Sequence, residues 1–206
     1  MGAARTIGLT GAVGAGKSSV AEWLARHGAA VLDADDLVHD LLASNRDVIA
    51  AVRARFGDVV IGATGQVDRT AVAAIVFADE RALADLERIL HPAVSAEVDA
   101  WLAQVVEPVA VVEAVKLIES GLGERFDEIW LVACDRRERR RRLIERGWAP
   151  DEVERRMSAS PSAAAQLALA DVVIDNSGTG DATSRQLEAA WRDLAARTDL
   201  AARTDS

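Results

Sequence analysis

A glycine-rich segment near the start of the chain constrains the fold more than any other feature of the sequence. Residues 11–18 read GAVGAGKS and match the pattern G-x-x-x-x-G-K-[ST]. The segment follows a short apolar run at residues 6–9 and precedes a helical pattern that extends to residue 27. In loops of this kind, backbone N–H groups surround a phosphate, and the following helix adds the positive end of its dipole. The sequence therefore predicts a phosphate-binding loop between a strand and a helix.

Two residues of this loop carry the expected chemistry. Lys17, one of only two lysines in the chain, would reach the β- and γ-phosphates of a nucleotide, and the Ser18 hydroxyl would coordinate Mg²⁺. The further nucleotide contacts that we expect are Gly14, Ala15, Gly16 and Ser19. A chance glycine-rich turn would need neither the strand nor the helix, and a GTPase switch would need an Asn-Lys pair, which the sequence lacks. We therefore predict a nucleotide-binding loop.

Apolar runs rich in Val, Ile and Leu recur along the chain, with helical patterns between them. They lie at residues 6–9, 29–32, 109–112, 128–134 and 171–174. Continuous apolar strands separated by helices are typical of a parallel sheet that is covered on both faces. We therefore predict an α/β protein with a three-layer P-loop NTPase fold and a five-stranded parallel sheet.

The helical patterns divide this single predicted domain, residues 1–206, into three parts. The core would comprise residues 1–36, 103–135 and 170–206. Residues from about 37 to 102 would form a helical region, with breaks near 57–65 and at His91-Pro92. Residues from about 136 to 160 would form a short lid with a break at Gly147 and Pro150.

Acidic residues follow two of the predicted strands. Asp33 and Asp35 lie just past the second strand, at the end where an open parallel sheet faces its ligand crevice. We expect Asp33 to accept a proton from an attacking hydroxyl, and Asp35 or Asp36 to cap the next helix; capping alone is the alternative for all three. Glu113 ends the third strand, as either an acid that organises Mg²⁺ or an ordinary carboxylate.

An arginine-rich run, RRERRRR at residues 136–142, resembles a nucleic-acid patch at first sight. The net charge of −9 opposes that interpretation. Because the run follows a strand that leads to the phosphate site, we expect a lid in which one or two arginines stabilise the transferring phosphoryl group. The candidates are Arg139, Arg142, Arg146 and Arg156, and the rest of the run would be solvated.

The order of these motifs resembles the dephospho-CoA kinase family over nearly the whole chain. The matching segments are IGLTGAVGAGKSS (7–19), LDAD (32–35), FG (56–57), GQVDR (65–69), LERILHP (86–92), EAVKLIESGL (113–122), RRLIERG (141–147) and ADVVIDNSG (170–178). The resemblance implies phosphorylation of the ribose 3′-hydroxyl of dephospho-CoA by ATP with Mg²⁺, which yields coenzyme A and ADP.

The resemblance also implies roles for single residues. It makes Asp33 the base and Arg142 the lid arginine, which together with Lys17 form the expected catalytic set, and it places Asn176 near the adenine of ATP. It makes the helical region, residues from about 37 to 102, the substrate-binding region, and the residues that it places against dephospho-CoA are Arg69, Leu86 and His91. Lys116 stands where the family is usually apolar, and substrate contact, subfamily variation and an edge salt bridge are all open for it. Ser160 and Gln166 replace a frequent glutamine and a frequent lysine.

Composition bounds the remaining function classes. No apolar run approaches the roughly 20 residues of a membrane span, and a single cysteine, Cys134, argues against a disulfide-built secreted fold. We therefore expect a cytoplasmic enzyme whose partners are ATP and dephospho-CoA, without nucleic acid or membrane, and with no signal for an oligomeric state. The alternatives are another small-molecule or nucleoside monophosphate kinase on the same scaffold, and a non-catalytic nucleotide-binding module.

Overall fold

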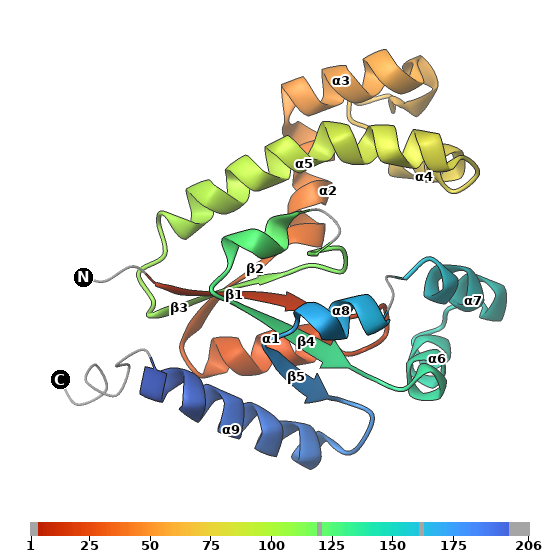
Figure 1. Cartoon of the computed structure of the whole chain (residues 1–206). Helices are drawn as coiled ribbons and strands as arrows, with labels where there is room; N and C mark the ends of the chain where they lie inside the picture. Colours follow the sequence, from red (N-terminus) through yellow and green to blue (C-terminus); the bar gives the residue numbers. More distant parts are fainter. Residues whose placement is uncertain (1–3, 119–120, 161–162, 198–206) are drawn as a thin grey trace. The chain divides into compact units, whose positions relative to one another are not determined.

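A five-stranded parallel sheet forms the centre of the fold (Figure 1). The computed structural model describes residues 4–118, 121–160 and 163–197. The strands are β1 (Arg5–Thr10), β2 (Ala29–Asp33), β3 (Val109–Glu113), β4 (Glu128–Ala133) and β5 (Val172–Asp175). Their order is β2-β3-β1-β4-β5, so β1 lies at the centre and pairs in parallel with β3 and β4. The predicted α/β fold and its five parallel strands are confirmed.

The chain divides into two compact units. Unit 1 comprises Met1–Leu32 and Val105–Ser206, and unit 2 comprises Asp33–Gln104. The sheet therefore belongs to unit 1 except for the last residue of β2. The helices described in unit 1 are α1 (Lys17–Arg26), α6 (Arg136–Glu145), α7 (Pro150–Ser158), α8 (Ala163–Leu169) and α9 (Gly180–Arg197), with a 3₁₀ turn at Leu122–Arg125.

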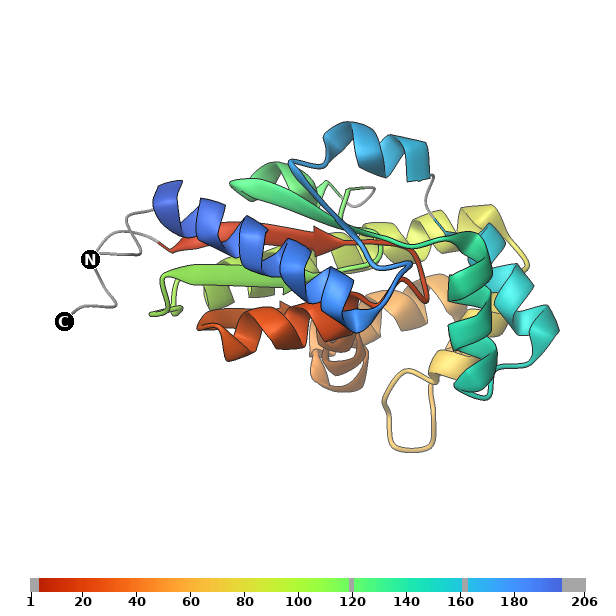
Figure 2. The same cartoon turned by 90° about the horizontal axis from the view of Figure 1, so that it is seen from below.

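Helices cover both faces of the sheet in unit 1. Figures 1 and 2 show α1 and α9 on one face, and α8 beside β4 on the other. Apolar side chains from β1, β4, α1 and α9 form the core of the first face; they include Leu9, Leu24, Trp130 and Leu194, all almost fully buried. Burial on both faces explains why β3 is apolar up to its last residue, Glu113.

Unit 2 is helical. It contains α2 (Ala34–Ser44), α3 (Arg46–Phe56), a 3₁₀ turn at Asp58–Val60, α4 (Arg69–Val76) and α5 (Glu80–Leu102). Each helix begins after a side chain that accepts backbone N–H groups of its first turn; these caps are Asp33, Asn45, Asp68 and Asp79. The predicted interruption near residues 57–65 is present, since these residues lie between α3 and α4.

The predicted break at His91-Pro92 is wrong, because α5 runs through both residues. Pro92 cannot donate a helical hydrogen bond, and proline inside a helix costs about 3 kcal/mol or more. A stripe of buried residues with four-residue spacing continues across it: Ala82, Leu86, Leu90, Val94 and Val98. Burying a large apolar side chain contributes about 1.5–3 kcal/mol, so the packing of this stripe outweighs the proline.

The arginine-rich segment forms two helices with a short connection. Gly147, with a φ of 88°, follows α6, and Pro150 is the first residue of α7, so the predicted break is present. The sequence interpretation assigns no element to residues 163–169, which form α8. Among the described helices, none is long and apolar enough to cross a bilayer.

Candidate nucleotide-binding and phosphoryl-transfer site

The glycine-rich segment joins the end of β1 to the start of α1, as the sequence predicts. Gly14 and Gly16 adopt positive φ angles of 80° and 94°. Gly16 is the N-cap of α1 in the left-handed conformation, and no side chain caps the helix. The first N–H groups of α1 therefore have no capping side chain, which is the arrangement that binds a phosphate at a helix N-terminus.

Three polar side chains meet just beyond this loop. Lys17 is only 8% exposed, and its ammonium lies 4.0 Å from Oε1 of Glu113 at the end of β3. The Ser18 hydroxyl donates a hydrogen bond to the same oxygen at 3.2 Å. Glu113 is itself 5% exposed. The opposite charges of these two buried groups offset part of the cost of removing each from water.

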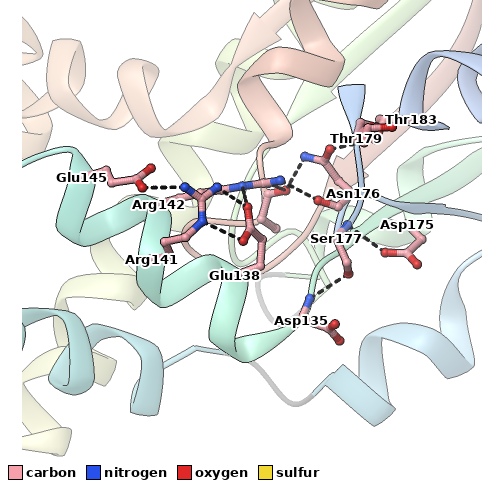
Figure 3. A network of polar contacts seen from close by, with 11 residues as sticks. Asp135, Glu138, Arg141, Arg142, Glu145, Asp175, Asn176, Ser177, Thr179 and Thr183 are labelled. Atoms are coloured by element: carbon pink, nitrogen blue, oxygen red, sulfur yellow. Dashed lines mark hydrogen bonds and ion pairs between the residues drawn. The ribbon is translucent and has the colours of Figure 1, made fainter. Parts of the chain in front are cut away.

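Two residues from distant parts of unit 1 contact the backbone of the loop (Figure 3). The Arg142 Nη1 atom of α6 lies 3.4 Å from the Ala15 carbonyl oxygen, and the Asn176 Nδ2 atom donates to the same oxygen at 2.8 Å. Arg142 Nη2 donates to the Asn176 carbonyl oxygen at 2.7 Å, which joins the two. The structure thus brings Lys17, Ser18, Arg142 and Asn176 together around the loop.

Both polar atoms of the Asn176 side chain take part in this network. Its Nδ2 atom donates to Ala15, and its Oδ1 atom accepts the Thr183 hydroxyl of α9 at 2.9 Å (Figure 3). An added Cβ at Gly16 would lie 2.2 Å from Asn176 Nδ2, so glycine is required there by close approach as well as by φ. Asn176 therefore ties the segment after β5 to the phosphate loop.

A carboxylate holds the arginine in place. Glu138 Oε1 accepts Arg142 Nε at 2.9 Å, one turn away on α6, and Glu138 also pairs with Arg141 (Figure 3). The hydrogen bond from Arg141, followed by that from Arg142, lowers the pKa of Glu138 to about 2. The pair that orients Arg142 therefore stays charged throughout the neutral range.

A cavity of 340 Å³ adjoins the network, and we call it the nucleotide cavity. Its lining comes from α1, α6, the segment after β5 and α9, and includes Gly16, Trp23, Arg26, Arg142, Arg146 and Asn176. The volume lies within the range of about 300–1,000 Å³ that is usual for small-molecule pockets. It gives a nucleoside a place next to the uncapped helix that would hold its phosphates. Arg146 was one of the predicted lid candidates; Trp23, Arg26, Glu138 and Thr183 were not predicted.

Asp33 lies in unit 2 and is the N-cap of α2. Its Oδ1 atom accepts the backbone N–H groups of Asp35 at 2.8 Å and Asp36 at 3.3 Å. The expectation that Asp35 or Asp36 caps this helix is therefore wrong, because α2 starts at Ala34, directly after the strand, and the cap must precede it.

The other residues predicted to contact an acceptor have different surroundings. Arg69 is the exposed first residue of α4, and His91 is half-buried on α5. Leu86 belongs to the buried stripe of α5. Lys116 of unit 1 is exposed after β3, and Glu119 of the same motif lies outside the described residues.

Comparison with known proteins identifies the family. A family model described as dephospho-CoA kinase matches residues 5–181. The chain belongs to the dephospho-CoA kinase family. The match includes the phosphate loop, Asp33, Glu113, Arg142 and Asn176, and it ends just before Thr183.

Named relatives agree with this membership, and a solved structure shares the fold. A protein of Symbiobacterium thermophilum named dephospho-CoA kinase is 42% identical over 192 residues, which cover 91% of this chain and 80% of the relative. One of Leifsonia xyli with the same name is 42% identical over 193 residues, which cover 91% and 98%. A crystal structure from Thermus thermophilus is 32% identical, with a TM-score of 0.80, and covers 94% of this chain and 99% of that one.

Proposed function

We propose that this member of the dephospho-CoA kinase family transfers the γ-phosphoryl group of ATP to the ribose 3′-hydroxyl of dephospho-CoA, which gives coenzyme A and ADP. One structural observation supports phosphoryl transfer above all. The buried Lys17 and the anchored Arg142 converge on a glycine-rich loop that leaves the start of α1 without a capping side chain. Two fixed cations beside an open helix N-terminus suit the negative charge of a transferring phosphoryl group.

ATP would bind with its phosphates at the start of α1 and its nucleoside in the nucleotide cavity. The contacts of the phosphate chain would be the backbone of Gly14, Ala15 and Gly16, the Lys17 ammonium, and the hydroxyls of Ser18 and Ser19. Asn176 would form the wall beside the adenine, since its own amide is already bonded to Ala15 and Thr183. Its role is to position the loop and the wall together.

The donor set around Ser18 fits Mg²⁺. The Ser18 hydroxyl and the Glu113 carboxylate lie 3.2 Å apart, and both are hard oxygen ligands of the kind that Mg²⁺ prefers. Ser18 would hold the ion directly, and Glu113 directly or through water. When bound, Mg²⁺ neutralises charge on the β- and γ-phosphates.

The charges of the transferring group would be stabilised by Lys17 and Arg142. Lys17 is fixed near Glu113, and Arg142 is fixed by Glu138 and by two backbone carbonyls. Because these contacts set both cations before substrate binds, little reorganisation is needed during transfer.

Asp33 would act as the general base on the 3′-hydroxyl. Both of the amide groups that it caps bind Oδ1, and we propose that Oδ2 accepts the proton as the hydroxyl attacks. Arg69, His91 and Lys116 would contact dephospho-CoA, and the buried Leu86 would shape the surface that these contacts need.

The test is ADP release with ATP and Mg²⁺ and a panel of acceptors: dephospho-CoA, AMP, CMP, shikimate and none. We expect release with dephospho-CoA alone, and its loss in Lys17→Ala. Turnover of AMP or CMP with inert dephospho-CoA would instead establish the alternative kinase. Tight ATP binding without turnover of any acceptor would favour a nucleotide-binding module.

A further inference from the structure

A cavity of 530 Å³ lies near the start of the phosphate loop, whereas the nucleotide cavity lies near its end. We call it the second cavity. It is lined by Ala12 of the loop, by the end of β4, by Arg139 of α6, by Gln166 of α8 and by the segment after β5. Among the described residues, no side chain lines both this cavity and the nucleotide cavity. The second cavity therefore has a lining of its own within unit 1.

Two side chains of this lining, Gln166 and Arg139, carry buried donor atoms without acceptors. The Gln166 side chain is 2% exposed, and its Nε2 atom makes no hydrogen bond. Two nitrogens of Arg139, Nε and Nη1, are likewise buried and without a partner. Amide and guanidinium nitrogens can only donate. Because a buried donor without an acceptor is unfavourable, these groups indicate a ligand that supplies acceptor atoms.

Arg139 differs in this respect from four other arginines of α6 and resembles only Arg137, which likewise has no ion pair with a described residue. Arg136, Arg140, Arg141 and Arg142 each bind a glutamate. No ion pair of Arg139 with a described residue is present. Burial lowers the pKa of the Arg139 guanidinium, as expected for a cation that loses water without gaining a carboxylate.

The titratable groups around Arg139 do not neutralise it. Burial raises the pKa of the Cys134 thiol, which favours its neutral form. Asp175 and Asp135 also line the cavity. The Asp175 carboxylate accepts the backbone N–H of Ser177, and neither aspartate forms an ion pair with Arg139. An anionic ligand in this cavity would therefore give Arg139 the ion pair that it lacks.

We propose that the second cavity is an anion-binding subsite in which Arg139 and Gln166 donate to the oxygen atoms of a phosphate or diphosphate group. Guanidinium binds such oxygens strongly because the hydrogen bonds are charge-assisted. Two sources have this chemistry. One is the diphosphate of the acceptor, which rests on the proposed function, and the other is free phosphate. Inorganic phosphate and diphosphate are suitable probes for both.

Binding is measured first, without turnover. Phosphate and diphosphate are titrated by calorimetry into enzyme saturated with a non-hydrolysable ATP analogue and Mg²⁺, so that the phosphate loop is filled. We expect Arg139→Ala to weaken anion binding by about tenfold or more, and Arg139→Lys to restore part of it. Arg137→Ala removes the same charge from the same helix outside the cavity lining, and should bind like wild type.

A second variant guards against misfolding of the first. Gln166→Met keeps an apolar stem of similar length but removes the donor, and should also weaken binding. Melting temperatures show whether each protein is folded. Equal affinities in wild type, Arg139→Ala, Gln166→Met and Arg137→Ala would overturn the proposal, and they would do so even if dephospho-CoA proved to be inert.

Kinetics then separate the two sources. If the acceptor supplies the diphosphate, Arg139→Ala should raise the KM for dephospho-CoA by about tenfold, with the KM for ATP unchanged. If free phosphate is the ligand, the KM for dephospho-CoA should not change, and added phosphate should alter the wild-type rate but not that of Arg139→Ala.

Discussion

Substitution of Asp33 separates its capping of α2, which the structure shows, from its proposed role as the base. Its Oδ1 atom caps α2 by accepting the N–H groups of Asp35 and Asp36. The proposed mechanism also makes Asp33 the base. Asparagine is as good an N-cap as aspartate, because its amide oxygen accepts the same N–H groups, but it cannot accept the proton of the substrate hydroxyl. Asp33→Asn therefore removes the base and keeps the cap.

Loss of the base should lower the rate, whereas loss of the cap should lower the stability. Loss of a general base costs about 10²–10⁴-fold in rate, so kcat of Asp33→Asn should fall by that factor. Its melting temperature and its affinity for ATP should stay close to those of wild type. Asp33→Ala removes the cap as well, which costs about 1 kcal/mol. For a chain of 206 residues, this corresponds to a melting temperature about 2–4 °C lower.

The assay is coupled ADP release at saturating ATP with varied dephospho-CoA, next to thermal melting of the three proteins. Calorimetric titration with the non-hydrolysable analogue gives the ATP affinity. The reasoning would be refuted if Asp33→Asn retained kcat within a factor of a few while Asp33→Ala lost only stability. Asp33 would then be a capping residue alone, and the base would have to be another group.

Three further predictions concern the loop and its supports. Gly16→Ala should greatly weaken ATP binding, since its Cβ would lie 2.2 Å from Nδ2 of Asn176. The control is Gly28→Ala, which has the same φ of 94° but open space around it, and it should lose only a little stability and bind ATP normally. Thr183→Val, which removes the hydroxyl bonded to Asn176, should raise the KM for ATP by about three- to tenfold with little change in the KM for dephospho-CoA, and Thr183→Ser should restore it. The pKa of Glu138 is lowered to about 2, so its stabilising effect is complete above the ordinary pKa near 4.5 and is lost as the pH falls toward 2. The difference in melting temperature between wild type and Glu138→Gln should therefore be constant above pH 5 and shrink below it. A constant difference down to pH 2 would contradict this.

Local sequence patterns were sufficient for the phosphate loop and the strands. Glycines at positive φ, a lysine at the helix start and continuous apolar runs are features of neighbouring residues, and they determine structure at short range. The preferred assignment of the helix cap, Asp35 or Asp36, lies two or three residues after the actual cap, Asp33, because several nearby aspartates offer the same capping chemistry.

Long-range contacts could not be predicted in the same way. The bonds that join Arg142 and Asn176 to Ala15 span 127 and 161 residues. Nothing in the local pattern around Thr183 indicates that its hydroxyl holds Asn176. Pro92 shows the converse, since a strong local signal for a helix end is overridden by the buried stripe of α5.

The central claim is that the phosphoryl group of ATP arrives on the 3′-hydroxyl of dephospho-CoA, and ³¹P NMR of the reaction product tests it most directly. We predict one new phosphomonoester resonance that coincides with that of authentic coenzyme A, formed together with ADP and absent with Lys17→Ala. A new phosphate ester at another position, or unchanged dephospho-CoA in a mixture where another acceptor has been phosphorylated, would contradict the claim.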